Sequence, residues 1–241
     1  IYNMPKTAII VGAGPGIGTA LASVLAQHGY SVGITGRRGE MLNEIKALYP
    51  EQIITMVADA THPKADEELD ALVHQLGGLD LLIISAGVAF INKTLDFALE
   101  DHTNQLNVVA FTKLANWGMH FFERQGHGHM ANISSVASRR GGRHAPAYHA
   151  SKAYQSNYFE GLRQRFHKRK LRIATTDIRP GFVDTAMAKG NGLFWVATKE
   201  KAAKQIYRAL QRKKAVVYIT KRWRIIGFIF SNMPKWMHKR L

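Results

Sequence analysis

A tyrosine and a lysine one helical turn apart could form an acid–base pair. Tyr148 and Lys152 lie four residues apart in the stretch AYHASKAY, residues 147–154, so in a helix they share a face. A phenol has an ordinary pKa of about 10, and it exchanges protons poorly near neutral pH unless its anion is stabilised. Lys152 could supply that positive charge and lower the pKa of Tyr148. The alternative is an ordinary amphipathic helix, and the pair alone does not decide between the two.

Such a pair must be positioned by the surrounding fold. The sequence pattern predicts a fold of alternating strands and helices. Apolar, β-rich runs occupy seven segments, which are 7–11, 30–35, 52–58, 79–85, 129–134, 172–178 and 215–220. Several are continuously apolar, which is typical of strands covered on both faces, and helical segments such as 17–28 and 41–49 lie between them. We therefore predict an α/β fold. Its form is a doubly wound Rossmann-type three-layer sandwich with a seven-stranded parallel sheet, in a single domain over 1–241.

The composition indicates a basic protein of a reducing compartment. The chain has 241 residues, no cysteine and a formal net charge of +16, so disulfides and thiolate chemistry are excluded. A strand-like run begins at Thr7 and leaves no room for a signal peptide, and we expect a cytoplasmic location. Residues 199–241 carry thirteen Lys and Arg against one acid, Glu200. Such a field attracts phosphate, nucleic acid or an anionic membrane; the alternative is a solvated basic face.

A glycine-rich turn follows the first predicted strand. The stretch VGAGPGIG, residues 11–18, spells G-x-x-x-G-x-G. Glycines let the backbone approach a pyrophosphate, and the helix that follows offers free N–H groups and a positive dipole. A purely structural turn is the alternative. We predict a dinucleotide-binding turn formed by Gly12, Gly14, Gly16, Ile17 and Gly18.

Two arginines stand where a cofactor ribose would be recognised. The second strand ends in TGRRGE, residues 35–40, and an NAD site usually has an acid at this point. Arg37 and Arg38 suit a 2′-phosphate by charge and by their planar donor forks. We predict NADP(H) in preference to NAD(H), with a solvated arginine pair as the alternative.

With these features in order, the chain resembles the short-chain dehydrogenase/reductase family over roughly residues 6–220. ADA (58–60), SAG (85–87), QLNVVAF (105–111), NISSVAS (132–138) and RPGFVDT (179–185) resemble its motifs, although Ser85 replaces a usual Asn. The resemblance implies that Asp59 binds the adenine amino group. It also implies cofactor contacts from Ala86, Gly87, Tyr148, Lys152, Pro180, Gly181, Val183 and Thr185.

The same resemblance implies a catalytic set and a reaction. The family's serine lies thirteen positions before its tyrosine, which selects Ser135 and leaves Ser134 pointing to the other side of the extended segment. Tyr148 would be the acid/base, Ser135 would stabilise the substrate oxygen, Lys152 would also hold the nicotinamide ribose, and Asn107 would anchor a water leading to solvent. The implied activity is that of an NADPH-dependent carbonyl reductase or alcohol dehydrogenase without a metal, in a homodimer or homotetramer. We read Tyr154 as a packing residue, and His127 and His129 as exposed polar residues.

Two segments near the end of the chain bear on the substrate. Residues 186–198 resemble a substrate lid, with Gly190 and Gly192 as candidate hinges; its apolar residues suggest a bulky apolar carbonyl or lipid-like substrate. They are Met187, Leu193, Phe194 and Trp195, of which Phe194 and Trp195 could instead be core anchors. The basic-aromatic extension 221–241 contains the apolar run 225–230 between Trp223 and Trp236, which is typical of an interfacial membrane anchor. A cover over the substrate cleft and a subunit interface are the alternatives.

Two other functions are compatible with parts of this pattern. A non-catalytic dinucleotide-binding regulator would not need Asn107, Ser135, Tyr148 and Lys152 together. A nucleic-acid-binding protein would explain the charge, but the sequence has no recognition module. We therefore expect an oxidoreductase that makes peripheral contact with a membrane and binds no nucleic acid.

Overall fold

All seven predicted strands form, each within two residues of its predicted bounds. The computed structural model describes residues 6–187 and 193–239. Its strands make one parallel sheet in the order β3-β2-β1-β4-β5-β6-β7. They are β1 Thr7–Val11, β2 Ser31–Gly36, β3 Ile53–Val57, β4 Leu81–Ile84, β5 His127–Ile133, β6 Arg172–Pro180 and β7 Val216–Ile219. The predicted doubly wound α/β fold is confirmed.

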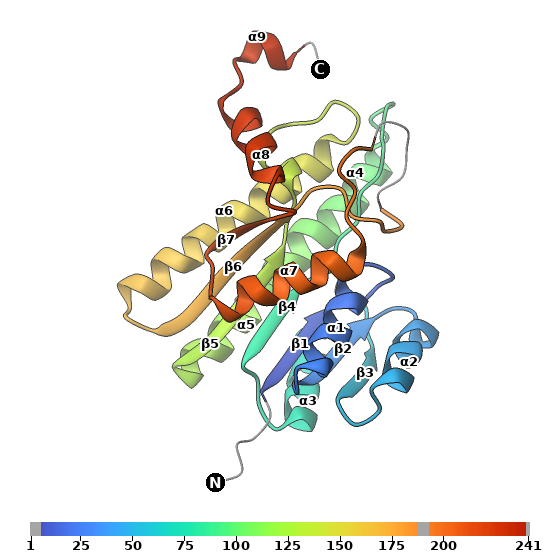
Figure 1. Ribbon diagram of the computed structural model, residues 1–241, viewed down its shortest axis with the longest axis vertical. Coiled ribbons are helices and arrows are strands. Elements are labelled where there is room, and N and C mark those ends of the chain that lie inside the picture. Colours follow the sequence, from blue (N-terminus) through green and yellow to red (C-terminus); the bar gives the residue numbers. More distant parts are fainter. Residues whose placement is uncertain (1–5, 188–192, 240–241) are drawn as a thin grey trace.

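Helices cover both faces of this sheet (Figure 1). On one face lie α1 Ile17–Gln27, α2 Gly39–Leu48 and α7 Lys199–Gln211, and on the other lie α3 Ala65–Leu76, α5 Phe111–Gln125 and α6 Pro146–Lys168. Each layer encloses its own apolar core, because the strand residues are buried on both faces. The shorter elements are α4 Phe97–Asn104, the π-helical turn η1 Gln105–Ala110, the 3₁₀ turn η2 Val136–Arg139, α8 Trp223–Asn232 and α9 Lys235–His238.

The strand order reverses between β1 and β4, and this reversal decides where a ligand can bind. β1 pairs with β2 on one side and with β4 on the other. The crossovers therefore leave in opposite directions, and the loops after the carboxyl ends of the two strands separate to form a crevice. The glycine turn follows β1, and the SAG segment follows β4.

Helix α6 carries the predicted acid–base pair into the interior. Pro146 occupies its first turn, where a missing N–H costs nothing. Further along, Phe159, Leu162 and Phe166 recur at helical spacing and are buried against the sheet. The same packing buries Lys152 near the start of the helix.

One expectation about histidines is wrong. His127 is exposed, but His129 is only 8% exposed, and its ring contacts the Thr176 hydroxyl at 2.8 Å on the neighbouring strand. Burial lowers the pKa of His129 to about 4, with a smaller effect from the charge of Lys213. The two residues share a strand face. His127 is the first residue of β5 and stays exposed, whereas His129 lies further along the strand and is covered.

Candidate active site

The glycine turn after β1 has the geometry of a phosphate cradle. Gly12 has φ +89°, and a Cβ on it would lie 2.5 Å from the backbone of Ala86, so only glycine fits this position. Gly16 precedes α1 and provides no side-chain cap, and the first turn of that helix contains no acid. The N–H groups at the start of α1 are therefore unopposed by negative charge. These residues fit the pyrophosphate of a dinucleotide.

Of the two predicted arginines, Arg38 lies beside this turn, and the charge of Arg37 acts on Asp59. Arg37 and Arg38 are exposed at the start of α2, and a Cβ on Gly14 would lie 3.8 Å from the Arg38 guanidinium. Across the described residues, neither makes a salt bridge. Exposed guanidinium groups at the start of α2 fit an added phosphate.

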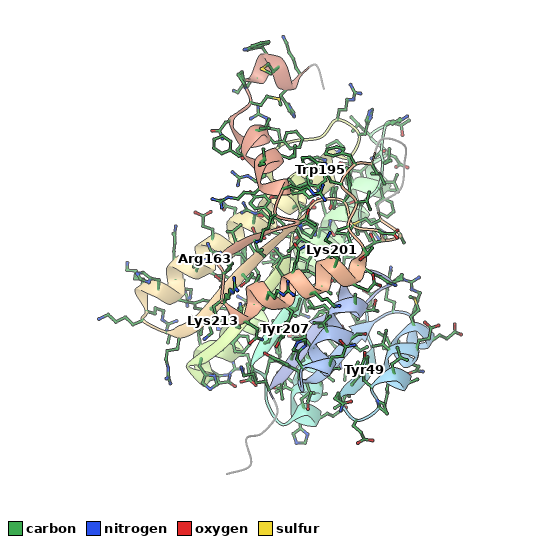
Figure 2. All side chains as sticks on the ribbon, in the orientation of Figure 1. Tyr49, Arg163, Trp195, Lys201, Tyr207 and Lys213 are labelled. Atoms are coloured by element: carbon green, nitrogen blue, oxygen red, sulfur yellow. The ribbon has the colours of Figure 1, made fainter. Side chains whose placement is uncertain are left out.

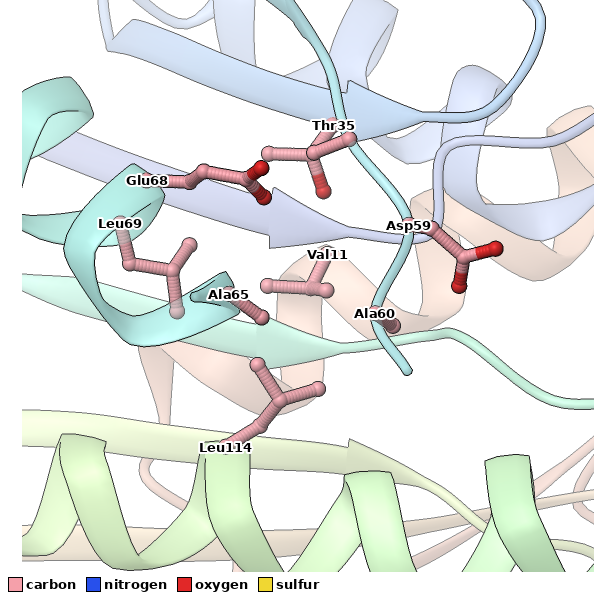
Figure 3. A pocket seen from close by; sticks show the side chains of 9 residues that line it. Val11, Thr35, Asp59, Ala60, Ala65, Glu68, Leu69 and Leu114 are labelled. Atoms are coloured by element: carbon pink, nitrogen blue, oxygen red, sulfur yellow. The ribbon is translucent and has the colours of Figure 1, made fainter. Parts of the chain in front are cut away.

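Asp59 follows β3 at the edge of a small recess (Figure 3). Its carboxylate accepts hydrogen bonds from the Thr61 N–H at 2.9 Å and the Thr61 hydroxyl at 2.8 Å. The Thr61 N–H is the main cause that lowers the pKa of Asp59, and Arg37 contributes. The recess is lined by the residues Val11, Thr35, Ala58, Asp59, Ala60, Ala65, Glu68, Leu69 and Leu114. The recess is too small to enclose an adenine ring, but the Asp59 carboxylate at its edge could accept a hydrogen bond from an amino group.

Ser135 and Tyr148 meet beside the carboxyl end of β5. Ser135 caps η2, and its Oγ accepts a hydrogen bond from the Ala137 N–H at 3.1 Å. The Tyr148 phenol interacts with the same hydroxyl. We expected the pKa of Tyr148 to be lowered through Lys152, but its net shift is upward. Burial raises that pKa, and the hydrogen bond with Ser135 only opposes the rise; the Lys152 Nζ lies 5.9 Å from the centre of the phenol ring.

Lys152 is a buried cation with two acceptors. Its side chain is 4% exposed, and its Nζ donates to the Ile133 carbonyl at 3.0 Å and to Gln155 Oε1 at 2.9 Å. Burial lowers the pKa of Lys152 to about 8, while the negative charge of Asp177 opposes that change. At neutral pH the group is therefore mainly ammonium.

Asn107 holds the loop after β4 against α6. It lies in the π-helical turn η1 and is fully buried. Its side chain pairs with Val88 in both directions, at 2.9 Å and 2.8 Å, and also donates to Ser151 Oγ at 3.1 Å. Its main-chain oxygen accepts a hydrogen bond from Gln155 Nε2 at 2.8 Å. The side chain thus fixes the position of the Gly87–Val88 segment next to Lys152.

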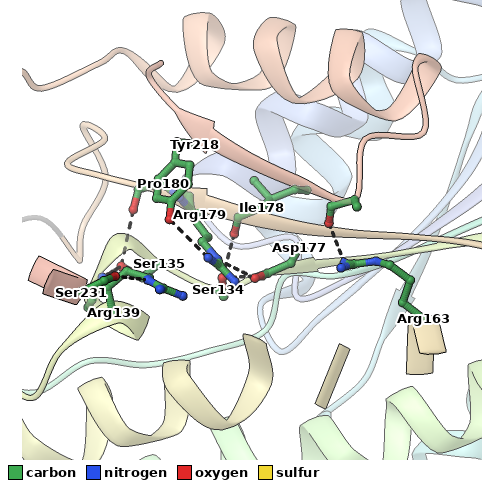
Figure 4. A network of polar contacts seen from close by, with 12 residues as sticks. Ser134, Ser135, Arg139, Arg163, Asp177, Ile178, Arg179, Pro180, Tyr218 and Ser231 are labelled. Carbon is green, nitrogen blue, oxygen red and sulfur yellow. Dashed lines mark hydrogen bonds and ion pairs between the residues drawn. The ribbon is translucent and has the colours of Figure 1, made fainter. Parts of the chain in front are cut away.

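A buried ion pair lies behind Ser135 (Figure 4). Asp177 and Arg179 pair at 2.7 Å on β6, and Ser134 Oγ donates to Asp177. Ser134 therefore faces this network while Ser135 faces Tyr148, as the spacing predicted. The network was not predicted, although two charged residues at i and i+2 in a buried strand place both on one face and could have indicated it.

An aromatic cluster connects the C-terminal helix α8 to the segment resembling a lid. Trp223 is 2% exposed; it stacks on Phe194 at 5.0 Å and meets Phe182 edge-on at 5.2 Å. Trp195 lies beside it, near α8 (Figure 2). A Cβ on Gly181 would lie 2.0 Å from the Trp223 ring, so the Pro-Gly turn can approach the indole only because position 181 is glycine.

The base of that segment is closed by backbone pairing. Val183 and Ala197 form a parallel bridge, with Asp184 N donating to the Ala197 carbonyl and Ala197 N to the Phe182 carbonyl. The candidate hinges Gly190 and Gly192 lie outside the described residues. Phe194 and Trp195 are 46% and 39% exposed, so they are anchored by Trp223 without being core residues.

The C-terminal extension also holds the segment that joins Ser135 to Tyr148. Arg139 Nε donates to Ser231 Oγ at 2.8 Å, and Arg140 donates to the Met233 carbonyl at 3.0 Å. The inner side of the extension is therefore part of the site's support. No described helix is both long and apolar enough to cross a membrane.

The comparisons with known proteins agree with this geometry. The family model described as short chain dehydrogenase matches residues 6–193. The chain belongs to the short-chain dehydrogenase family. An uncharacterized oxidoreductase of Staphylococcus haemolyticus is 32% identical over 191 residues, covering 76% of this chain and 80% of the relative. One from Staphylococcus aureus is 30% identical over 186 residues with the same coverage.

Solved structures with the same fold include other short-chain dehydrogenases. A short-chain dehydrogenase from Streptomyces avermitilis aligns with a TM-score of 0.81 at 22% identity, over 94% of this chain and 91% of that chain. ElxO with NADP bound aligns with a TM-score of 0.79 at 22% identity, over 90% and 97%. At these identities the likeness shows the fold. The family membership makes the chain an oxidoreductase. Separately, within the described ranges, no group of three or more His, Cys, Asp or Glu could hold a metal ion.

Proposed function

We propose that this dehydrogenase reduces ketones, or oxidises secondary alcohols, with NADP(H). The observation that supports this most strongly is the meeting of Ser135, Tyr148 and Lys152 beside a glycine cradle. Hydride transfer at carbon requires a matching proton transfer at oxygen. The bound nicotinamide supplies or accepts the hydride.

The chain's own residues handle the proton and the charge. Tyr148 gives its proton to the substrate oxygen during reduction and takes it back during oxidation. Ser135 donates a hydrogen bond to that oxygen as negative charge develops. The Lys152 ammonium favours the phenolate that remains, and Asn107 fixes the loop against which the lysine is buried.

The preference for NADP(H) rests on the arginine pair. Arg37 and Arg38 are free of salt bridges with described acids, and no acid stands at the end of β2 to bind a ribose hydroxyl. ElxO, which shares the fold, has been solved with NADP bound. Charge-assisted contacts to a phosphate typically contribute more than neutral hydrogen bonds.

A carbonyl panel assayed with both cofactors tests this proposal. We expect kcat/KM to be at least about ten-fold higher with NADPH than with NADH, and we expect Arg38→Ala to remove most of that difference. Arg172→Ala is the control, because Arg172 is exposed at the other end of the sheet. A preference for NADH would contradict the cofactor proposal, and no turnover of any carbonyl would contradict the reaction. Long-chain ketones belong in the panel, because the half-exposed Phe194 and Trp195 favour a bulky apolar substrate.

We also propose that the outer face of α8 contacts an anionic membrane from the cytoplasmic side. Ile225, Phe228 and Ile229 are 60%, 68% and 45% exposed at helical spacing, opposite the buried Trp223. The sequence of the same extension has six cations and no Asp or Glu between residues 221 and 241; the cations are Lys221, Arg222, Arg224, Lys235, Lys239 and Arg240. An apolar stripe surrounded only by positive charge suits a surface of anionic lipid.

Vesicle flotation with substituted proteins tests the membrane proposal. We expect the triple variant Ile225→Ser, Phe228→Ser, Ile229→Ser to bind phosphatidylglycerol-containing vesicles at least about ten-fold more weakly than wild type. High salt should also weaken the wild-type interaction. Leu48→Ser is the control, because Leu48 is 67% exposed on α2. Equal binding by the triple variant would contradict the proposal. Truncation at Thr220 is a poorer test, because it also removes the buried Trp223.

A further inference from the structure

The side chain of Gln155 connects Lys152 to the main chain of Asn107. Gln155 lies on α6, one turn after the lysine, and is fully buried. Its Oε1 accepts from Lys152 Nζ at 2.9 Å, and its Nε2 donates to the Asn107 carbonyl at 2.8 Å. One amide group thus spans from the cation to the π-helical turn η1.

The Gln155 side chain lies where the sequence led us to expect a water molecule. The resemblance implied that Asn107 anchors a water leading away from Lys152. Here the Asn107 main-chain oxygen accepts from a protein amide. An amide has a fixed donor end and a fixed acceptor end, so it holds its two partners at a set separation in a way that a single water does not.

We propose that Gln155 is a positioning residue that holds the Lys152 ammonium in place and favours its charged form. The inference rests on the proposed function, because it concerns the group that stabilises the Tyr148 phenolate. An ammonium has three donors and no acceptor. Two donors have protein acceptors, Ile133 O and Gln155 Oε1, which leaves the third for the nicotinamide ribose.

Burial makes this acceptor important. Lys152 is 4% exposed, so water cannot readily replace a lost hydrogen bond. The titratable groups that face it are Tyr148 on its own helix and Asp177 on β6, and η1 and β5 present the uncharged Asn107 and the Ile133 carbonyl. Removing the Gln155 acceptor therefore leaves the cation with fewer stabilising partners.

Opposite substitutions at Gln155 test the role. In Gln155→Leu the charged lysine loses an acceptor, so its pKa falls, and we expect the alkaline limb of kcat to move down by about one pH unit. In Gln155→Glu a carboxylate faces the ammonium, so the limb should move up. We also expect kcat of the Leu variant to fall about ten- to a hundred-fold, with a smaller change in KM for NADPH.

Ser156→Ala is the matched control. Ser156 is the next residue of α6; it is 7% exposed, and its hydroxyl has no hydrogen-bond partner among the described residues. Its removal should leave the pH profile unchanged. Gln155→Met, which keeps the side-chain length, replaces the Leu variant if that protein does not fold.

The titration of Lys152 gives a readout that does not depend on turnover. NMR of isotope-labelled lysine, assigned with Lys152→Met, follows its pKa in each variant. If wild type reduces no carbonyl, the proposed function fails while this titration still tests Gln155. A Lys152 pKa that is unchanged, or that moves in the same direction in the Leu and Glu variants, overturns the inference.

Discussion

Tyr148→Phe is expected to reduce kcat about a hundred- to ten-thousand-fold while NADPH still binds. The substitution removes only the phenolic oxygen, which is the group that we propose exchanges a proton with the substrate. General acid–base groups typically contribute rate factors of this size. The ring remains to pack against its neighbours. Cofactor binding should survive, because the substitution leaves the glycine turn and the arginine pair proposed to hold the cofactor unchanged. Steady-state kinetics and NADPH fluorescence titration measure the two effects.

Tyr154→Phe is the control for this experiment. Tyr154 lies on the same helix, where its hydroxyl contacts Thr112 Oγ1 at 2.8 Å and its ring stacks on Tyr158, in keeping with the predicted packing role. We expect little change in its kcat. If Tyr148→Phe retains most of the wild-type rate, Tyr148 is not the proton donor.

Trp223→Ala is expected to have the largest effect on stability, about 3–5 kcal/mol. Removal of a fully buried aromatic side chain leaves a cavity that its surroundings fill only in part. Here the cavity would open between Gly181, Phe182 and Phe194. Denaturant unfolding measures the loss. Because the same ring anchors the segment after the Pro-Gly turn, we also expect KM for the carbonyl substrate to rise.

Phe228→Ala is the control that tests whether the loss of stability depends on the burial of Trp223 or would follow from any aromatic substitution in α8. Phe228 lies on the same helix but is 68% exposed, so its removal should change stability by less than about 1 kcal/mol in the absence of vesicles. Comparable destabilisation by both substitutions would mean that α8 as a whole, and not the Trp223 anchor, stabilises the domain.

The two faces of α8 therefore have different surroundings. The inner face touches the Pro-Gly turn and Phe194 through Trp223, and η2 through the Arg139–Ser231 hydrogen bond. The outer face presents Ile225, Phe228 and Ile229 to the surroundings.

Features that depend on local sequence were predictable. The strands were found from continuous apolar runs, since burial on both faces leaves no polar alternation. The glycine turn could be recognised because phosphate binding requires a backbone that other residues cannot adopt, as Gly12 shows. Tyr148 and Lys152 were paired through helical periodicity alone, and the spacing that selected Ser135 agrees with where Ser134 points.

Features that depend on which side chains meet could be decided only by the tertiary structure. The burial of His129, the pKa of Tyr148, and the partners of Gln155 and Trp223 all depend on elements distant in the chain. Sequence periodicity specifies a face but not what covers it, and electrostatic effects depend on burial as much as on charge. The type of chemistry could therefore be predicted from the sequence. How the side chains of the site are held was decided by the packing of α6 against η1 and of α8 over the Pro-Gly turn.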